Sequence, residues 1–139
     1  MSLAHAADRS FALRCIFAGA LLMFLGVVLG AFGAHALQQT LTPRQLSSYQ
    51  TGVLYQQLHS LALILIGVIA LLTSATAWLS RAAVLFGVGI LVFSGSIYLM
   101  TLGAPRALGI VTPIGGVCLL LAWLALAAHA WRASGRGPA

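Results

Sequence analysis

The sequence predicts an all-α integral membrane protein, in which four helices form a bundle that crosses a bilayer up, down, up and down. Hydrophobic residues make up 61% of the 139 residues and charged residues only 6%, whereas a soluble domain carries about 25% charged residues. Four apolar runs are each long enough to supply the ~20 residues of a transmembrane helix. They occupy residues 15–131, which leaves short loops and no soluble domain.

The first run covers residues 15–37 and follows an N-terminal segment, residues 1–14, that we expect in the cytoplasm. Its glycines share one helical face, and small residues on one face let a neighbouring helix approach closely. These packing glycines are Gly19, Gly26, Gly30 and Gly33. Residues 34–36 (Ala-His-Ala) resemble the cleavage site of a secretory signal, but the apolar part of a signal spans only about 7–15 residues. We therefore expect a retained transmembrane helix.

The second helix is expected to begin at Thr42 and Pro43 and to end near Leu72. Thr is a favourable N-cap, and Pro suits the first turn of a helix. The outer part of this helix is amphipathic. Its apolar stripe is formed by Leu46, Tyr49, Val53, Leu58 and Leu61. Its other face, the most polar helical face in the protein, is formed by Gln45, Ser48, Gly52, Tyr55 and His59, with Gln56 beside them.

The third run covers residues 82–102 and follows Arg81. Pro105 and the two glycines of residues 103–109 end it, because Pro and Gly punctuate helices strongly. Thr112 and Pro113 then repeat the Thr-Pro helix start, and the fourth span runs to about residue 131. Residues 132–139 form a short polar tail.

Small residues also mark one face on each of these two helices. On the third helix, Gly87 can share a face with Ala83, Ser94 and Tyr98. On the fourth, Gly115 begins a seam that continues through Cys118, Ala122 and Ala125. We expect Gly87 and Gly115 to be helix-packing contacts, like the glycines of the first helix.

The distribution of arginine predicts the orientation. All seven positive charges are Arg and are scattered singly at the ends of apolar runs, whereas nucleic-acid binding needs them clustered on one face. Four spans place both termini and the loop near residue 80 on one side, which holds Arg9, Arg14, Arg81, Arg132 and Arg136. The other side holds only Arg44 and Arg106. The positive-inside rule therefore predicts that both termini are cytoplasmic.

The spans lack the groups that most membrane enzymes and pumps require. Asp8, the only acidic residue, precedes the first apolar run, whereas proton and cation pathways commonly use buried Asp, Glu or His chains. There is also no P-loop, no GxSxG motif and no CxxC pair. This inventory argues against most ion-coupled transporters and most hydrolases. We expect no enzyme activity, no catalytic residue, no metal site and no cofactor.

The polar residues of the spans outline a candidate site around His59, one to two turns below the outer membrane surface. Tyr55 lies one turn earlier on the same face. We expect these partners at the same level: Gln56, Ser94, Tyr98 and Thr112. Burial without a carboxylate favours a neutral imidazole, which donates from one nitrogen and accepts at the other. Two interpretations stay open: a pocket that opens outward, or an interhelical hydrogen-bond network that fixes the packing.

His35 lies at the outer end of the first span. Two histidines on adjacent helices can bind haem or a metal, so the alternative hypothesis is a small transporter or a haem- or metal-binding protein that uses His35 and His59. The leading hypothesis is a non-enzymatic protein that binds a lipid, a small apolar ligand or a larger membrane complex. Its expected partners are membrane lipids and either another membrane protein or a second copy of the chain.

Four ordered motifs carry a family resemblance. They are residues 30–35 (GAFGAH), 55–63 (YQQLHSLAL), 93–98 (FSGSIY) and 112–116 (TPIGG). In this order they resemble the YgdD/YwdK family of small bacterial inner-membrane proteins, over about residues 15–128. The resemblance implies a four-span protein of the bacterial cytoplasmic (inner) membrane, and it implies no biochemical activity.

Overall fold

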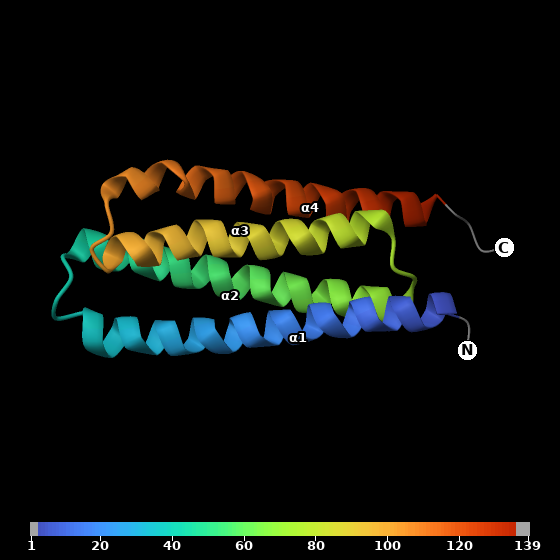
Figure 1. Cartoon of the computed structure of the whole chain (residues 1–139), viewed down its shortest axis with the longest axis horizontal. Helices are drawn as coiled ribbons and strands as arrows, with labels where there is room; N and C mark the ends of the chain where they lie inside the picture. The colour runs from blue at the N-terminus through green and yellow to red at the C-terminus, as the bar shows by residue number, and fades with distance from the viewer. Residues whose placement is uncertain (1–2, 136–139) are drawn as a thin grey trace.

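The computed structural model describes residues 3–135, which form four long antiparallel helices (Figure 1). The helices are α1 (Leu3–Phe32), α2 (Pro43–Leu72), α3 (Ala77–Thr101) and α4 (Thr112–Ser134). A π-helical turn, η1 (Gly33–Leu37), extends α1, and a 3₁₀ helix, η2 (Arg106–Ile110), precedes α4. All four long helices are long and apolar enough to cross a membrane. The predicted four-span helical bundle is therefore confirmed.

The helices pack in the order of the chain. α1 packs along α2, α2 along α3 and α3 along α4, and the four ribbons lie in that order across the view of Figure 1. Half of the most apolar window of α2 is buried inside the protein, compared with 17% for α1 and 22% for α4. The bundle is thus an open row in which α2 and α3 are central and α1 and α4 are the edges.

Two helix starts depart from the sequence prediction. α1 already includes residues 3–14, because Ala12 is fully buried and its carbonyl lies against Gly67 of α2. α3 begins at Ala77, five residues earlier than expected, since the Thr76 hydroxyl accepts the backbone N–H of Leu79 as an N-cap. Both segments lie at the end of the row where the termini are (Figure 1), and each contributes one buried residue, Ala12 and Leu79.

The two Thr-Pro pairs behave differently. At α2 the N-cap prediction is confirmed: the Thr42 hydroxyl accepts from the Gln45 N–H, and the Gln45 side chain accepts from the Thr42 N–H at 3.0 Å. At α4 the N-cap is Val111, without a side-chain hydrogen bond. Thr112 lies inside the helix, where its hydroxyl bonds Ser96 on α3. The predicted cap is wrong there because η2 already leads the backbone into the helix.

The four glycines predicted on the first helix all face α2. A Cβ atom at Gly19 would lie 2.7 Å from the carbonyl oxygen of Ser60, and one at Gly33 would lie 2.6 Å from the Tyr49 ring. Gly26 and Gly30 contact Gln57 and Val53 of α2 in the same way. Real Cβ atoms are essentially never found closer than 3.0 Å to such atoms, so glycine at positions 19, 26 and 33 is what permits the close approach of α1 and α2.

The two glycines predicted as packing contacts on α3 and α4 have different surroundings. Gly115 lies against the backbone of Phe93, as its place in the small-residue seam suggests. Gly87 has no neighbour within 4 Å of a built Cβ, so its predicted packing role is wrong. Gly89, two residues further along the same helix, is buried against Leu119 instead. The face of α3 that packs on α4 is therefore the face of Gly89 and not the predicted face of Gly87.

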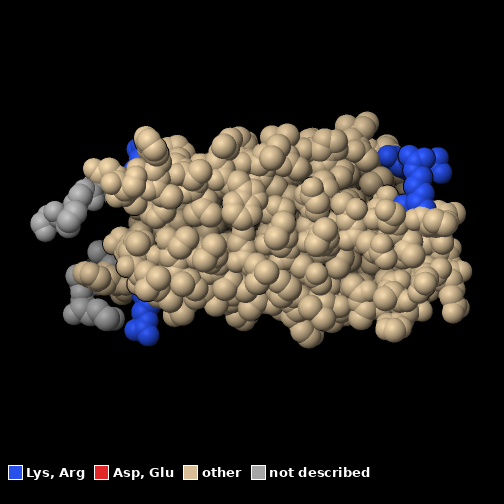
Figure 2. All heavy atoms as spheres, turned by 180° about the vertical axis from the view of Figure 1, so that it is seen from behind, with Lys and Arg blue, Asp and Glu red and all other residues tan. Residues whose placement is uncertain are grey.

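The surface of the protein is largely apolar along the length of the helices, as expected for a bundle surrounded by lipid. Arg side chains gather at the two ends of the molecule, and the length between them is free of charge on the face that Figure 2 shows. On α2, Leu58 and Leu61 point outward with about half of their surface exposed, whereas Gln56 and His59 are buried. Polar side chains turn inward because hydrocarbon offers them no hydrogen-bond partner.

Candidate functional site

A hydrogen-bond network around Gln56 joins three helices. The Tyr98 hydroxyl of α3 donates to Oε1 of Gln56 at 2.9 Å, and Nε2 of Gln56 donates to the Leu22 carbonyl of α1 at 2.8 Å. The Tyr49 hydroxyl donates to the Leu29 carbonyl at 2.8 Å, and its ring packs on Tyr98 with centroids 5.2 Å apart. The network thus fixes the positions of α1 and α3 on opposite sides of α2.

The remaining polar residues of the spans bond elsewhere. Ser94 donates to the Gly52 carbonyl at 2.8 Å across the α2–α3 interface. Thr112 and Ser96 share a hydrogen bond of 2.7 Å between α4 and α3. Within residues 3–135, every buried side-chain nitrogen or oxygen has a hydrogen-bond partner. The arrangement matches the packing-network interpretation, because each polar group already has a protein partner.

His59 stands apart from this network, in a cage of aromatic rings. Its Nδ1 lies 2.7 Å from the carbonyl oxygen of Tyr55. A carbonyl only accepts, so Nδ1 carries the proton. The imidazole packs against the rings of Tyr55, Phe86 and Trp123, with centroids 5.5 to 6.1 Å apart. The cage brings α2, α3 and α4 together. Contrary to expectation, Ser94, Tyr98 and Thr112 make their hydrogen bonds to other groups and not to the imidazole.

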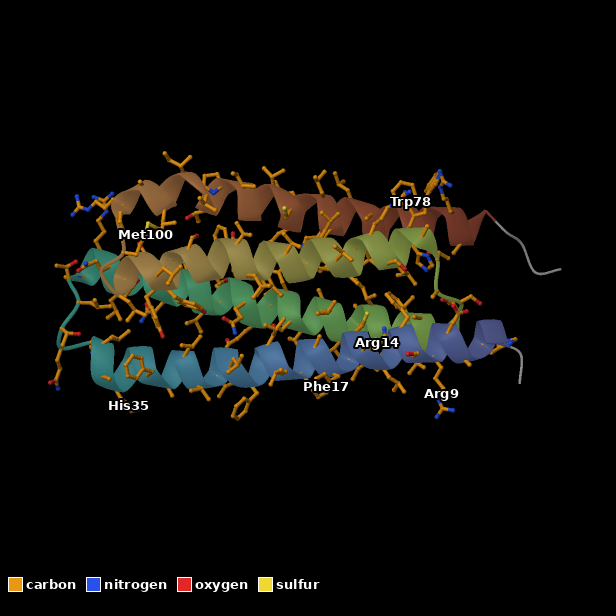
Figure 3. All side chains as sticks on the ribbon, viewed as in Figure 1. Arg9, Arg14, Phe17, His35, Trp78 and Met100 are labelled. Carbon is orange, nitrogen blue, oxygen red and sulfur yellow. The ribbon has the colours of Figure 1, made fainter. Side chains whose placement is uncertain are left out.

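The structure does not bring His35 and His59 together. His35 is exposed on η1, at the end of the molecule away from the termini (Figure 3). Its neighbour Gly33 packs on Tyr49, ten residues and therefore about 15 Å along α2 from His59. The described residues hold no group of three His, Cys, Asp or Glu side chains that could bind a metal ion. The two histidines do not form a shared haem or metal site.

A second cluster, at the end of the molecule with the termini, was missed by the sequence analysis. The guanidinium groups of Arg81 and Arg132 both lie over the Trp78 ring, 4.9 and 5.1 Å from its centroid. Nearby, His129 is buried and its Nδ1 bonds the Thr76 hydroxyl at 2.9 Å. Figure 3 shows Trp78 at this end. The sequence does contain a local sign of this cluster, because Trp78 and Arg81 are one helical turn apart, and so are His129 and Arg132.

Trp78 lines two hollows between α3 and α4. The larger, about 730 Å³, is lined mainly by apolar side chains of both helices, with Arg81 at its rim. The smaller, about 250 Å³, is lined by Thr76, His129 and Arg132, among others. We call the larger hollow the α3–α4 groove. Side chains of both helices line it, and nearly all of them are apolar.

The sequence matches the family described as Protein of unknown function (DUF423) over residues 29–116. The chain belongs to this family. It is 38% identical to the UPF0382 inner membrane protein YgdD of Escherichia coli over 82% of this chain and 86% of that protein. It is 37% identical to the UPF0382 membrane protein YwdK of Bacillus subtilis, over 78% and 89% of the two chains. A UPF0382 membrane protein of Staphylococcus aureus is 42% identical over 80% and 89%.

These comparisons confirm the resemblance to YgdD and YwdK and identify the chain as a membrane protein. No solved structure matches it. The DUF423 region includes the side chains of the Gln56 network, His59, Trp78 and Arg81, whereas Leu22 precedes it and Trp123, His129 and Arg132 lie beyond its end. The family description assigns no activity, so function has to be argued from the two clusters and the groove.

Proposed function

We propose that this DUF423 protein is a non-enzymatic membrane protein that binds a lipid in the α3–α4 groove. The groove is the observation that carries the proposal. Its walls include Val84 and Leu85 from α3 and Leu121 and Leu124 from α4, and Trp78 closes one end. Small-molecule sites are concave and mostly apolar, with few polar groups. A groove of this composition that faces a bilayer suits an acyl chain.

The network around Gln56 supports a structural rather than a catalytic role for the outer polar residues. Each of its hydrogen bonds joins protein groups on different helices. Catalytic groups are commonly held close to a substrate position with their reactive atoms free to act. Here the hydroxyl of Tyr98 and the amide of Gln56 are consumed by packing contacts. The non-enzymatic proposal rests on this pairing.

We also propose that the protein lies in the bacterial cytoplasmic membrane with both termini in the cytoplasm. The Escherichia coli relative is named an inner membrane protein. The sequence places five Arg on the side of the termini and two on the other side, and the positive-inside rule favours the cytoplasm for the richer side. On this orientation the α3–α4 groove opens to the cytoplasmic leaflet.

Native mass spectrometry of the purified protein tests lipid binding. We expect the wild type to retain phospholipid through detergent washing that removes loosely bound lipid. Ala128 lines the groove and is half-buried, so Ala128→Leu should fill the space and reduce the lipid-bound fraction. Ala130→Leu, on the same helix but exposed, is the matched control and should retain lipid. Equal lipid retention in both variants would place the lipid elsewhere.

A further inference from the structure

We infer that the α3–α4 groove is a site for an anionic glycerophospholipid, whose phosphate is held by Arg81 and Arg132. The inference rests on the proposed function and adds the lipid class, the headgroup contacts and the leaflet. It is carried by three features of one place in the fold: an apolar groove, two arginines over one indole ring, and a smaller hollow beside them that contains Arg132.

The two arginines form an unneutralised positive pair. The guanidinium groups lie 4.9 and 5.1 Å from the centre of the Trp78 ring, which places them no more than 10.0 Å apart, with Arg81 at the rim of the α3–α4 groove and Arg132 in the smaller hollow. Among residues 3–135, neither makes an ion pair or a hydrogen bond. Asp8, the only acidic residue, belongs to α1 at the far edge of the row. A phosphate at this position would relieve the repulsion between the two cations.

The indole ring gives the arginines a fixed geometry. A cation over an aromatic face is attracted by the ring, more strongly when water is excluded. An arginine stacked in this way loses less freedom when it binds, and its planar fork matches two oxygens of a phosphate. Because Arg81 comes from α3 and Arg132 from α4, the phosphate would also tie the two helices together at this end.

The two hollows fit the two parts of a phospholipid. The α3–α4 groove, about 730 Å³, offers apolar walls towards the bilayer interior. The hollow of about 250 Å³, which Trp78 also lines, has mainly apolar walls, and Arg132 supplies the positive charge that suits the phosphate. Trp78 lines both hollows, and Trp is enriched where membrane and water meet.

Two other hollows with arginines lack one of these parts. A hollow of about 510 Å³ near Arg9 and Arg14 is lined only by residues of α1, so no second helix encloses it. At the opposite end, a hollow of about 490 Å³ near Arg44 and Arg106 is lined largely by polar side chains such as Gln45. Among these hollows, the α3–α4 groove combines apolar walls from two helices with Arg81 at its rim and with Arg132 against the same Trp78 ring.

The test measures lipid preference on the delipidated full-length protein by native mass spectrometry. Phosphatidylglycerol and phosphatidylcholine with identical acyl chains are the probes. Two nearby cationic side chains should make phosphatidylglycerol bind about tenfold more tightly than phosphatidylcholine, and added salt should reduce the difference. Arg81→Gln with Arg132→Gln should abolish the preference while phosphatidylcholine still binds.

Matched variants keep the result interpretable. Arg9→Gln with Arg14→Gln removes two positive charges from the same membrane face and should leave the preference unchanged. Arg81→Lys with Arg132→Lys keeps the charge without the planar fork, so it should retain only part of the preference. Unchanged helix content by circular dichroism confirms that each variant is folded. A preference that survives in the double Gln variant, or disappears equally in the Arg9/Arg14 variant, overturns the inference.

A second measurement locates the lipid. In a Trp123→Phe, Trp131→Phe background, Trp78 is the only tryptophan, and phosphatidylglycerol with brominated acyl chains should quench its fluorescence more than brominated phosphatidylcholine. Ala128→Leu should weaken both effects. If neither lipid binds the wild type, the proposed function itself fails. If both bind and quench equally, lipid binding stands and only the anionic selectivity is wrong.

Discussion

The Tyr98 hydroxyl donates a hydrogen bond of 2.9 Å to Oε1 of Gln56, across the interface between α3 and α2. The same amide donates to the Leu22 carbonyl on α1, so one side chain connects three of the four helices. Hydrocarbon cannot replace any of these partners. The loss of one partner therefore leaves another polar group unpaired.

Gln56→Leu should destabilise the protein. It leaves the Tyr98 hydroxyl without its acceptor, and an unpaired buried polar group costs about 1–3 kcal/mol. Thermal unfolding in detergent, followed by circular dichroism, measures the effect. Gln50→Leu changes an exposed glutamine of the same helix and is the control. If both variants unfold at the wild-type temperature, the network does not hold the helices together.

Gly115→Ala and Gly87→Ala should have opposite effects. A Cβ at Gly115 would meet the Cα of Phe93 at 2.8 Å, and backbone cannot move aside cheaply. A Cβ at Gly87 meets nothing, so replacing a helical glycine by alanine there should stabilise by roughly 0.5–1 kcal/mol. The melting temperatures of the two variants, compared with that of the wild type in detergent, test this prediction. A stabilised Gly115→Ala variant would mean that α3 and α4 are not in close contact.

The stability of His59 variants should depend mainly on how well the new side chain fills the space of the imidazole. Its hydrogen bond is local, to Tyr55, while its ring fills the space between Phe86 and Trp123. His59→Ala should therefore cost roughly 2–4 kcal/mol, as for other large core side chains, and His59→Phe should be tolerated better than His59→Gln. Thermal unfolding ranks the three variants. A variant that keeps wild-type stability but loses a co-purifying molecule would instead make His59 a ligand contact.

Reporter fusions test the orientation. A reporter after Ala139 should be active only as a cytoplasmic fusion, and a reporter inserted between residues 38 and 48 only as a periplasmic one, because five Arg lie on the side of the termini. A periplasmic signal from the C-terminal fusion would reverse the orientation and would move the α3–α4 groove to the outer leaflet.

The four spans and the Thr42 cap were predictable because they depend on local signals. Long apolar runs specify transmembrane helices, and Thr42 finds Gln45 three residues later. The partner of each polar side chain was not predictable, because it depends on which helix lies alongside and at what rotation. Tyr98 was expected near His59 and bonds Gln56 instead.

The same limit explains Gly87 and Gly89. Gly87 and Gly89 are two positions apart and therefore lie about 200° apart around the helix, on nearly opposite faces, and the sequence does not show which of these faces meets α4. The Trp78 cluster was missed for a related reason. Arg81 and Arg132 are far apart in sequence, and only the packing of α3 on α4 brings both to one ring.

The open row has a consequence for how the protein is made. Each helix packs mainly on its neighbours in the chain, which gives the fold a low contact order and only short loops to close. The hairpin of α1 and α2 can dock its glycines before α3 has been synthesised, and α4 then packs mainly on α3, with Trp123 also reaching His59 of α2. Assembly can therefore proceed in step with synthesis, one hairpin at a time, with residues 73–76 as the joint between the two halves.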